Sequence, residues 1–255
     1  MILVRKKKAV QRGSSQPESA VNDEKGSMSL LEHLAELRKR LLVAVIALLL
    51  TTMFSFSFAE RLIDLLAYPI GGIDFLQSIE VTENISVYMR VSLLSGFILA
   101  LPITLYEIYA FVSVGLEEKE KRWILTGIPV ALLLFIAGVA FAYFVMLRNA
   151  LPFLLGFINV QAVPRLSNYV AFVTNLMFWI GISFQTPLVV FLLAKLNFVT
   201  AKALLKQWRI AVVVIAVVAA VISPTVDPIN MGLIMLPLFA IYLLSIVFAA
   251  MAKMK

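Results

Sequence analysis

The sequence contains no cysteine and a single histidine, His33. Without cysteine, the chain has no disulfide framework, no thiolate nucleophile and no thiolate ligand for a metal. No second histidine exists to assist His33, so we interpret it as a local structural contact rather than a base or a metal ligand. We therefore expect no bound metal, no cofactor and no catalytic residue.

Charged residues are also scarce. They make up 15% of the 255 residues, whereas hydrophobic residues make up 62% and the mean hydropathy is +0.97. Soluble domains are roughly 45–50% apolar, so this balance excludes an ordinary soluble enzyme. The net charge of +7 does not indicate nucleic-acid binding, because the basic residues lack interleaved aromatic residues and any recognisable RNA or DNA module. Beside membrane segments, lysine and arginine instead record topology and contacts with anionic lipid.

The apolar residues form six long blocks, each near the ~20 residues that a helix needs to cross a bilayer. The blocks cover residues 37–58, 88–112, 123–147, 169–194, 208–222 and 229–250. They predict an all-α, polytopic membrane protein with six transmembrane helices in a domain over residues 28–251. The fifth block offers 13 apolar residues, 210–222, which rise only about 20 Å. A tight turn at 223–228 joins it to the sixth, so we expect helices five and six to be short.

Both ends of the chain are polar. Residues 1–27 combine a basic start with glycine, serine, proline and mixed charges, and they cannot bury a core. We predict a disordered basic tail there and a short C-terminal tail over residues 252–255. No apolar stretch begins before Leu41, which disfavours a cleaved secretory signal.

The distribution of lysine and arginine predicts the orientation. Nine precede the first helix, three follow the second, four lie between the fourth and fifth, and two end the chain, which accounts for eighteen of the 22. The other loops hold only Arg61, Arg148 and Arg165, with Arg90 at the start of the second helix. Because basic residues concentrate on the cytoplasmic side, both termini are predicted to be cytoplasmic.

The first external loop, residues 59–87, is acidic and carries five carboxylates against one arginine. Its leucines and isoleucine over residues 62–66 predict a short amphipathic helix at the membrane interface. Pro69, Gly71 and Gly72 then mark a turn.

A motif precedes the first apolar block. Residues 29–41 read SLLEHLAELRKRL, in which Ser29 and Glu32 form a capping box that starts a helix. Glu36 and Arg40 are four residues apart, so a weak surface ion pair is expected on this helix. On periodicity alone, a solvated charged face explains these residues.

This motif resembles the N-terminal signature of the TatC family, the central subunit of the twin-arginine protein translocase. Further segments resemble the family in order and spacing: residues 101–107 with Phe111, 116–122, 140–144, 223–228 and Pro237. The resemblance implies recognition of signal peptides with paired arginines and export of folded proteins driven by the protonmotive force. It also implies a homo-oligomeric complex with single-span TatA- and TatB-like partners in the cytoplasmic (inner) membrane.

The family's recognition glutamates match Glu36 and Glu120, and Arg38 matches a position near the same site. Paired guanidinium groups need charged, planar acceptors, which carboxylates supply through charge-assisted hydrogen bonds. For Arg38, a topological anchor is an equally adequate explanation. For Glu120, the alternative is a solvated loop charge.

Five further residues are candidates for a functional role: Gln185, Glu107, Phe111, Pro69 and Asp227. Many family members have glutamate where this chain has Gln185. Glutamine can form hydrogen bonds but cannot titrate, which argues against a protonation step at this position. A hydrogen bond that packs two helices together is therefore as good an explanation of Gln185 as a functional role. Glu107 lies near the cytoplasmic end of the second helix, where it either is hydrated or faces a cavity. Asp227 is expected to cap the sixth helix, because carboxylates favour helix N-termini.

Two other classes compete with the translocase. A secondary transporter for a small solute is the alternative, but the sequence has few charges at midplane and no internal repeat. An intramembrane serine protease needs a base at membrane depth, and the only histidine lies before the first span.

Overall fold

The structure is a computed structural model that describes residues 30–113, 118–156, 163–223 and 228–252. Its regular elements in these ranges are all helical, so the predicted all-α class is confirmed. Within these described ranges, five helical spans are long and apolar enough to cross a membrane, and one further apolar helix is shorter. The predicted tail at 1–27 lies outside the described residues. Of the tail predicted at 252–255, Ala252 is the last residue of α10 and residues 253–255 lie outside the described residues.

The helices follow the predicted blocks and extend beyond most of them. In chain order they are α1 Leu30–Phe56, α2 Ala59–Ala67, η1 Tyr68–Ile70, η2 Ile73–Phe75, α3 Glu83–Ser113, α4 Glu118–Phe141, η3 Ala142–Leu147, α5 Arg148–Gly156, α6 Leu166–Ser183, α7 Thr186–Lys195, α8 Ala201–Lys206, α9 Trp208–Ile222 and α10 Pro228–Ala252. The amphipathic helix predicted in the first external loop is α2, which buries Ile63 and Leu66. The third span continues through the π-helical turn η3 into α5.

The last two spans differ in length. The helix α9, predicted as the fifth span, has 15 residues and rises about 22 Å, so it is short as predicted and falls below the length of the five candidate spans in the described residues. The sixth, α10, has 25 residues, so the prediction that it is also short was wrong. Its apolar sequence continues to Ala252, and Pro237 lies inside the helix without ending it. Membrane helices tolerate such a proline because neighbouring groups compensate for the lost hydrogen bond.

The fourth span is broken where the sequence predicted one helix. A turn at Phe184 and Gln185 separates α6 from α7, and Pro187 lies in the first turn of α7. Proline is favoured there because it has no N–H to donate within the helix.

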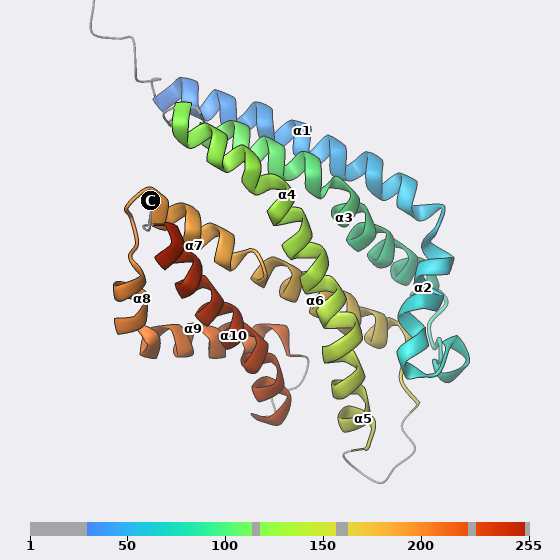
Figure 1. The fold of residues 1–255 in the computed structure, drawn as a ribbon. Helices are drawn as coiled ribbons and strands as arrows, with labels where there is room; N and C mark the ends of the chain where they lie inside the picture. The colour runs from blue at the N-terminus through green and yellow to red at the C-terminus, as the bar shows by residue number, and fades with distance from the viewer. Residues whose placement is uncertain (1–29, 114–117, 157–162, 224–227, 253–255) are drawn as a thin grey trace, which may run out of the picture.

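The helices form a bundle with two distinct ends (Figure 1). The starts of α1 and α4 and the ends of α7 and α10 lie at one end, here named the terminal end. The opposite end, here named the cap end, holds α2 and α5. Helix α1 packs mainly on α3, whereas α10 packs on α7 and α9. The main buried cluster joins α2, α3, η3, α6, α9 and α10.

Helices α1 and α3 approach closely at Gly96. A Cβ atom added at Gly96 would lie 2.6 Å from the Cα atom of Thr52 and 2.5 Å from its hydroxyl oxygen. The neighbouring Thr51 hydroxyl donates a hydrogen bond to the Gly96 carbonyl oxygen, at 2.8 Å. In a membrane the hydrophobic effect does not drive helices together, because lipid tails are as apolar as the side chains. Close packing of small residues and hydrogen bonds between helices hold them together instead.

At the cap end, Glu83 joins the first external loop to the start of α6. Its buried carboxylate accepts hydrogen bonds from the backbone N–H groups of Ile79, at 2.9 Å, and Ser167, at 2.6 Å. It also accepts a hydrogen bond from the Arg165 Nε–H group, at 3.2 Å. Glu80 binds the other side of Arg165, at 2.8 Å, but remains 63% exposed. We name the group formed by Ile79, Glu80, Glu83, Arg165 and Ser167 the cap clasp.

Replacing Gly96 by alanine is expected to destabilise the bundle. The new methyl group meets backbone atoms of α1, so the helices must separate, at a cost of about 1–3 kcal/mol. Thermal unfolding of the purified protein in detergent measures this change. The matched control is Gly232→Ala, where nothing lies within 4 Å of the added atom. Equal stability of the two variants would contradict the close packing of α1 on α3.

The cap clasp predicts a strong asymmetry between its two glutamates. Glu83→Gln replaces a buried acceptor oxygen by an NH₂ group that faces backbone donors, so the melting temperature is expected to fall by several degrees. Glu80→Gln removes one negative charge from an exposed ion pair, so it is expected to change the melting temperature by about one degree or less. A larger effect of Glu80→Gln would refute this assignment.

Candidate functional site

A cluster of charged side chains lies between α1 and α3 towards the terminal end. The Arg40 Nε atom lies 2.7 Å from Glu36 Oε1, and its Nη1 atom lies 3.0 Å from Glu107 Oε2. The side chains of Arg40, Glu36 and Glu107 are 28%, 21% and 11% exposed. Arg40 therefore links two carboxylates from different helices in a half-buried setting. We name these three residues the Arg40 cluster.

Local helix geometry and the pairing of α1 with α3 build this cluster. Glu36 and Arg40 are four residues apart on α1, which places them on one face of the helix. Glu107 is 67 residues away from Arg40 in the sequence and reaches it because α3 packs along α1. The guanidinium fork can serve two acceptors at once, which a lysine ammonium does with less geometric control.

The Arg40 cluster keeps a net negative charge and open acceptor positions. Two carboxylates face one guanidinium, so one negative charge remains uncompensated within the cluster. Among the described residues, Glu36 Oε2 and Glu107 Oε1 make no hydrogen bond. Ionised carboxylates accept bonds at both oxygens, so the cluster can bind further cationic donors.

An aromatic contact borders the Arg40 cluster. His33, one turn before Glu36, stacks on Phe111, one turn after Glu107, with ring centroids 4.4 Å apart and an interplanar angle of 28°. The stack supports the interpretation of His33 as a local structural contact. It also places Phe111 beside the charged cluster, where it forms a flat, partly exposed wall.

The other charged candidates are less defined. Arg38 is exposed and makes no ion pair within the described residues. Glu120 lies in the first turn of α4, but its side chain is outside the described residues. Asp227 also lies outside them.

Gln185 lies at the break between α6 and α7. Its side-chain Nε2 atom donates a hydrogen bond to the Ala131 carbonyl oxygen of α4, at 2.8 Å. This contact is the hydrogen bond between helices that the sequence left as one alternative. Gln185 therefore links the broken fourth span to the third.

Pro69 lies in η1, which directly follows α2 and contacts α2 and α5 at the cap end. The turn that follows uses two glycines with positive φ, Gly71 at 107° and Gly72 at 110°, a conformation that other residues rarely adopt. The predicted turn is confirmed, and Pro69 is not part of the charged site.

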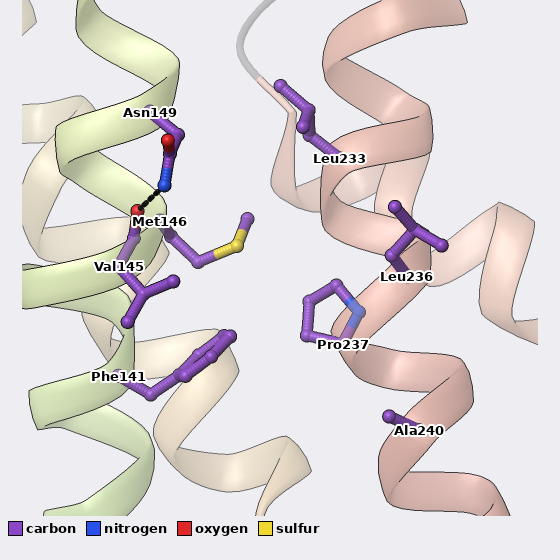
Figure 2. Close-up of a pocket in the computed structure, with 8 residues that line it drawn as sticks. All are labelled: Phe141, Val145, Met146, Asn149, Leu233, Leu236, Pro237 and Ala240. Carbon is purple, nitrogen blue, oxygen red and sulfur yellow. Dashed lines mark hydrogen bonds between the residues drawn. The ribbon is translucent and has the colours of Figure 1, made fainter.

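A cavity of about 320 Å³ lies in another part of the bundle (Figure 2). Figure 2 shows Phe141, Val145, Met146 and Asn149 on one wall and Leu233, Leu236, Pro237 and Ala240 on the other. The only polar side chain among them, Asn149, donates to the Val145 carbonyl oxygen at 2.6 Å. This cavity has no charged lining and does not belong to the Arg40 cluster.

Arg40 is the residue whose role the sequence did not reveal. The spacing indicated its pair with Glu36 but assigned that pair to a solvated face, and Glu107 was considered separately. A signal was present, because a glutamate near the end of a membrane span needs a cationic partner or water. The identity of that partner depends on how α1 packs on α3.

Known proteins are similar to this chain over a range that includes the Arg40 cluster. The family model for TatC, the Sec-independent protein translocase protein, matches residues 32–237. The Sec-independent protein translocase protein TatC of Carboxydothermus hydrogenoformans is 35% identical over 231 residues, covering 89% of this chain and 95% of the relative. TatCy of Bacillus subtilis is 34% identical over 236 residues, covering 89% of this chain and 91% of the relative.

A crystal structure described as the twin-arginine translocase receptor TatC has the same fold. It superimposes with a TM-score of 0.78 at 34% sequence identity, covering 87% of this chain and 99% of that one. These findings do not support the secondary-transporter alternative. Together with the apolar helices, they show that this chain is a multi-pass membrane protein and belongs to the TatC family.

Proposed function

We propose that this chain is the receptor subunit of a twin-arginine protein translocase. It binds signal peptides with paired arginines and starts the export of folded proteins, driven by the protonmotive force. Support comes from membership of the TatC family and from the name of the similar crystal structure, a twin-arginine translocase receptor. The proposed activity is binding and assembly without catalysis.

The Arg40 cluster is the observation that carries this proposal. Glu36 keeps an acceptor oxygen beside its bond to Arg40, and it is 21% exposed, so an arriving guanidinium can reach it. We propose that Glu36 and Glu120 hold the paired arginines of the signal peptide. Arg40 acts as a positioning residue, since its bonds to Glu36 and Glu107 fix the direction of the carboxylate. Arg38 lies next to this site and contributes to its rim.

In the proposed orientation the chain lies in the cytoplasmic (inner) membrane, and its terminal end faces the cytoplasm. The basic residues concentrate in the loops and tails of that end, which is the side where positive charge accumulates. The Arg40 cluster then faces arriving precursors, and the cap clasp lies on the external side. Single-span TatA- and TatB-like proteins and further copies of this chain are the proposed partners within the bilayer.

Glu36→Gln is expected to weaken binding of a twin-arginine signal peptide by about tenfold, because one charge-assisted hydrogen bond is lost. Glu120→Gln is expected to have an effect in the same direction. Peptide titration of the purified protein, with a twin-lysine peptide as the ligand control, measures both changes.

Glu32→Gln is the matched variant, because it removes one charge from the same helix one turn earlier. It is expected to bind the peptide as the parent does. The proposal fails if the parent binds twin-lysine and twin-arginine peptides equally, or if Glu32→Gln weakens binding as much as Glu36→Gln.

A further inference from the structure

The connection between α7 and α9 is basic and carries no acidic residue. Residues 195–209 include Lys195, Lys202, Lys206 and Arg209 and contain neither aspartate nor glutamate. Lys202, Lys206 and Arg209 are exposed and form no ion pair within the described residues. Their charges are therefore available to an anionic partner.

Large apolar side chains are exposed in the same segment. Phe198 is 77% exposed, Leu205 55% and Trp208 51%. Trp208 also carries the Arg209 guanidinium 5.8 Å from its ring centroid. Cations next to exposed aromatic and aliphatic groups are typical of a helix that lies on an anionic membrane surface.

The backbone turn after α7 makes the exposure of Phe198 unusual. Asn197 has a positive φ of 63°, and the N–H groups of Asn197 and Phe198 donate to the Ala194 and Leu193 carbonyl oxygens. This is the hydrogen-bond pattern of a Schellman motif, in which the apolar residue at the Phe198 position commonly packs back on its own helix. Here that ring is instead free for another apolar environment.

Fixed contacts hold the segment beside α10. The Tyr242 hydroxyl donates to the Leu204 carbonyl oxygen at 2.7 Å, and Thr200 caps α8 by accepting from the Ala203 N–H at 3.1 Å. In Figure 1, α8 follows the end of α7 and lies close to α10. The basic and apolar side chains are thus presented from a defined surface next to two membrane spans.

We propose that residues 195–209 bind the headgroups of anionic phospholipids. Lys202, Lys206 and Arg209 contact the lipid phosphates, while Phe198, Leu205 and Trp208 enter the interface. A lipid fits better than an acidic protein segment, because the segment directly joins two apolar helices and exposes cations and apolar groups together. The site is independent of signal-peptide binding, and the proposed orientation serves only to assign it to the cytoplasmic leaflet.

Trp208 provides a local reporter for the test. Trp123→Phe and Trp179→Phe leave it as the single tryptophan of the chain. The full-length protein is reconstituted in phosphatidylcholine bilayers with a minor fraction of phosphatidylglycerol. Brominated acyl chains are placed on one lipid or the other at the same mole fraction. Quenching of Trp208 by phosphatidylglycerol is expected to exceed quenching by phosphatidylcholine by about threefold or more.

Lys202→Gln/Lys206→Gln is expected to bring this quenching ratio close to one. The charge-preserving pair Lys202→Arg/Lys206→Arg is expected to keep it. The matched control, Arg61→Gln/Arg148→Gln, removes two exposed arginines from the cap end and is expected to leave the ratio unchanged.

A ratio of one in the parent protein would overturn the proposal, as would an equal loss in the glutamine pair and in the cap-end control. Twin-arginine peptide binding is measured on the same reconstituted samples. Since the quenching ratio involves no peptide, either proposal can fail without the other.

Discussion

Arg40 binds a carboxylate from its own helix and another from α3, and this bridge organises the terminal end of the bundle. A guanidinium is always charged and presents a rigid fork, so it fixes the direction of both carboxylates. Among the residues that the structure describes, no other donor binds the second oxygen of either carboxylate. Acceptors that are held in advance in this way lose less entropy when they bind a further guanidinium. The His33 and Phe111 rings close one side of the same site.

The two ends of the molecule use their charges differently. At the cap end, the Glu83 carboxylate is saturated by backbone N–H groups and by Arg165, so it stabilises the loop and offers little to a ligand. In the Arg40 cluster, Glu36 is partly exposed and Glu107 is buried, and each carboxylate has one oxygen without a hydrogen bond from the described residues. The basic segment 195–209 presents cations without any counter-charge of its own. Charged groups whose hydrogen-bond positions are filled by the protein stabilise the fold, whereas those with positions left can bind a partner.

The sequence predicted the elements of the fold well, because membrane helices must satisfy their backbone hydrogen bonds within long apolar runs. Residues 208–222 match α9, and α2 was visible in its amphipathic pattern. The break at Gln185 was missed, since apolar residues continue on both sides of it. The shortness predicted for the sixth helix was wrong, because of the two helices that flank residues 223–228 only α9 is short, whereas α10 runs from Pro228 to Ala252.

The site was only partly predictable. The resemblance of the motif in residues 29–41 indicated Glu36, and the i, i+4 spacing indicated its bond with Arg40. The bond from Arg40 to Glu107 spans 67 positions and depends on the register of α1 against α3, which Gly96 and Thr51 help to set. Pairwise contacts of this kind follow from tertiary packing and not from local pattern.

Mapping the bound signal peptide is the most direct test of the central claim. A photoreactive group is placed next to the paired arginines of a precursor, and its cross-links to the full-length protein are identified by mass spectrometry. The account predicts cross-links to residues 33–40 of α1, 107–111 of α3 and the first turn of α4 around Glu120, which are lost when the paired arginines are replaced by lysines. Cross-links confined to α2 or to α9 and α10 would contradict it.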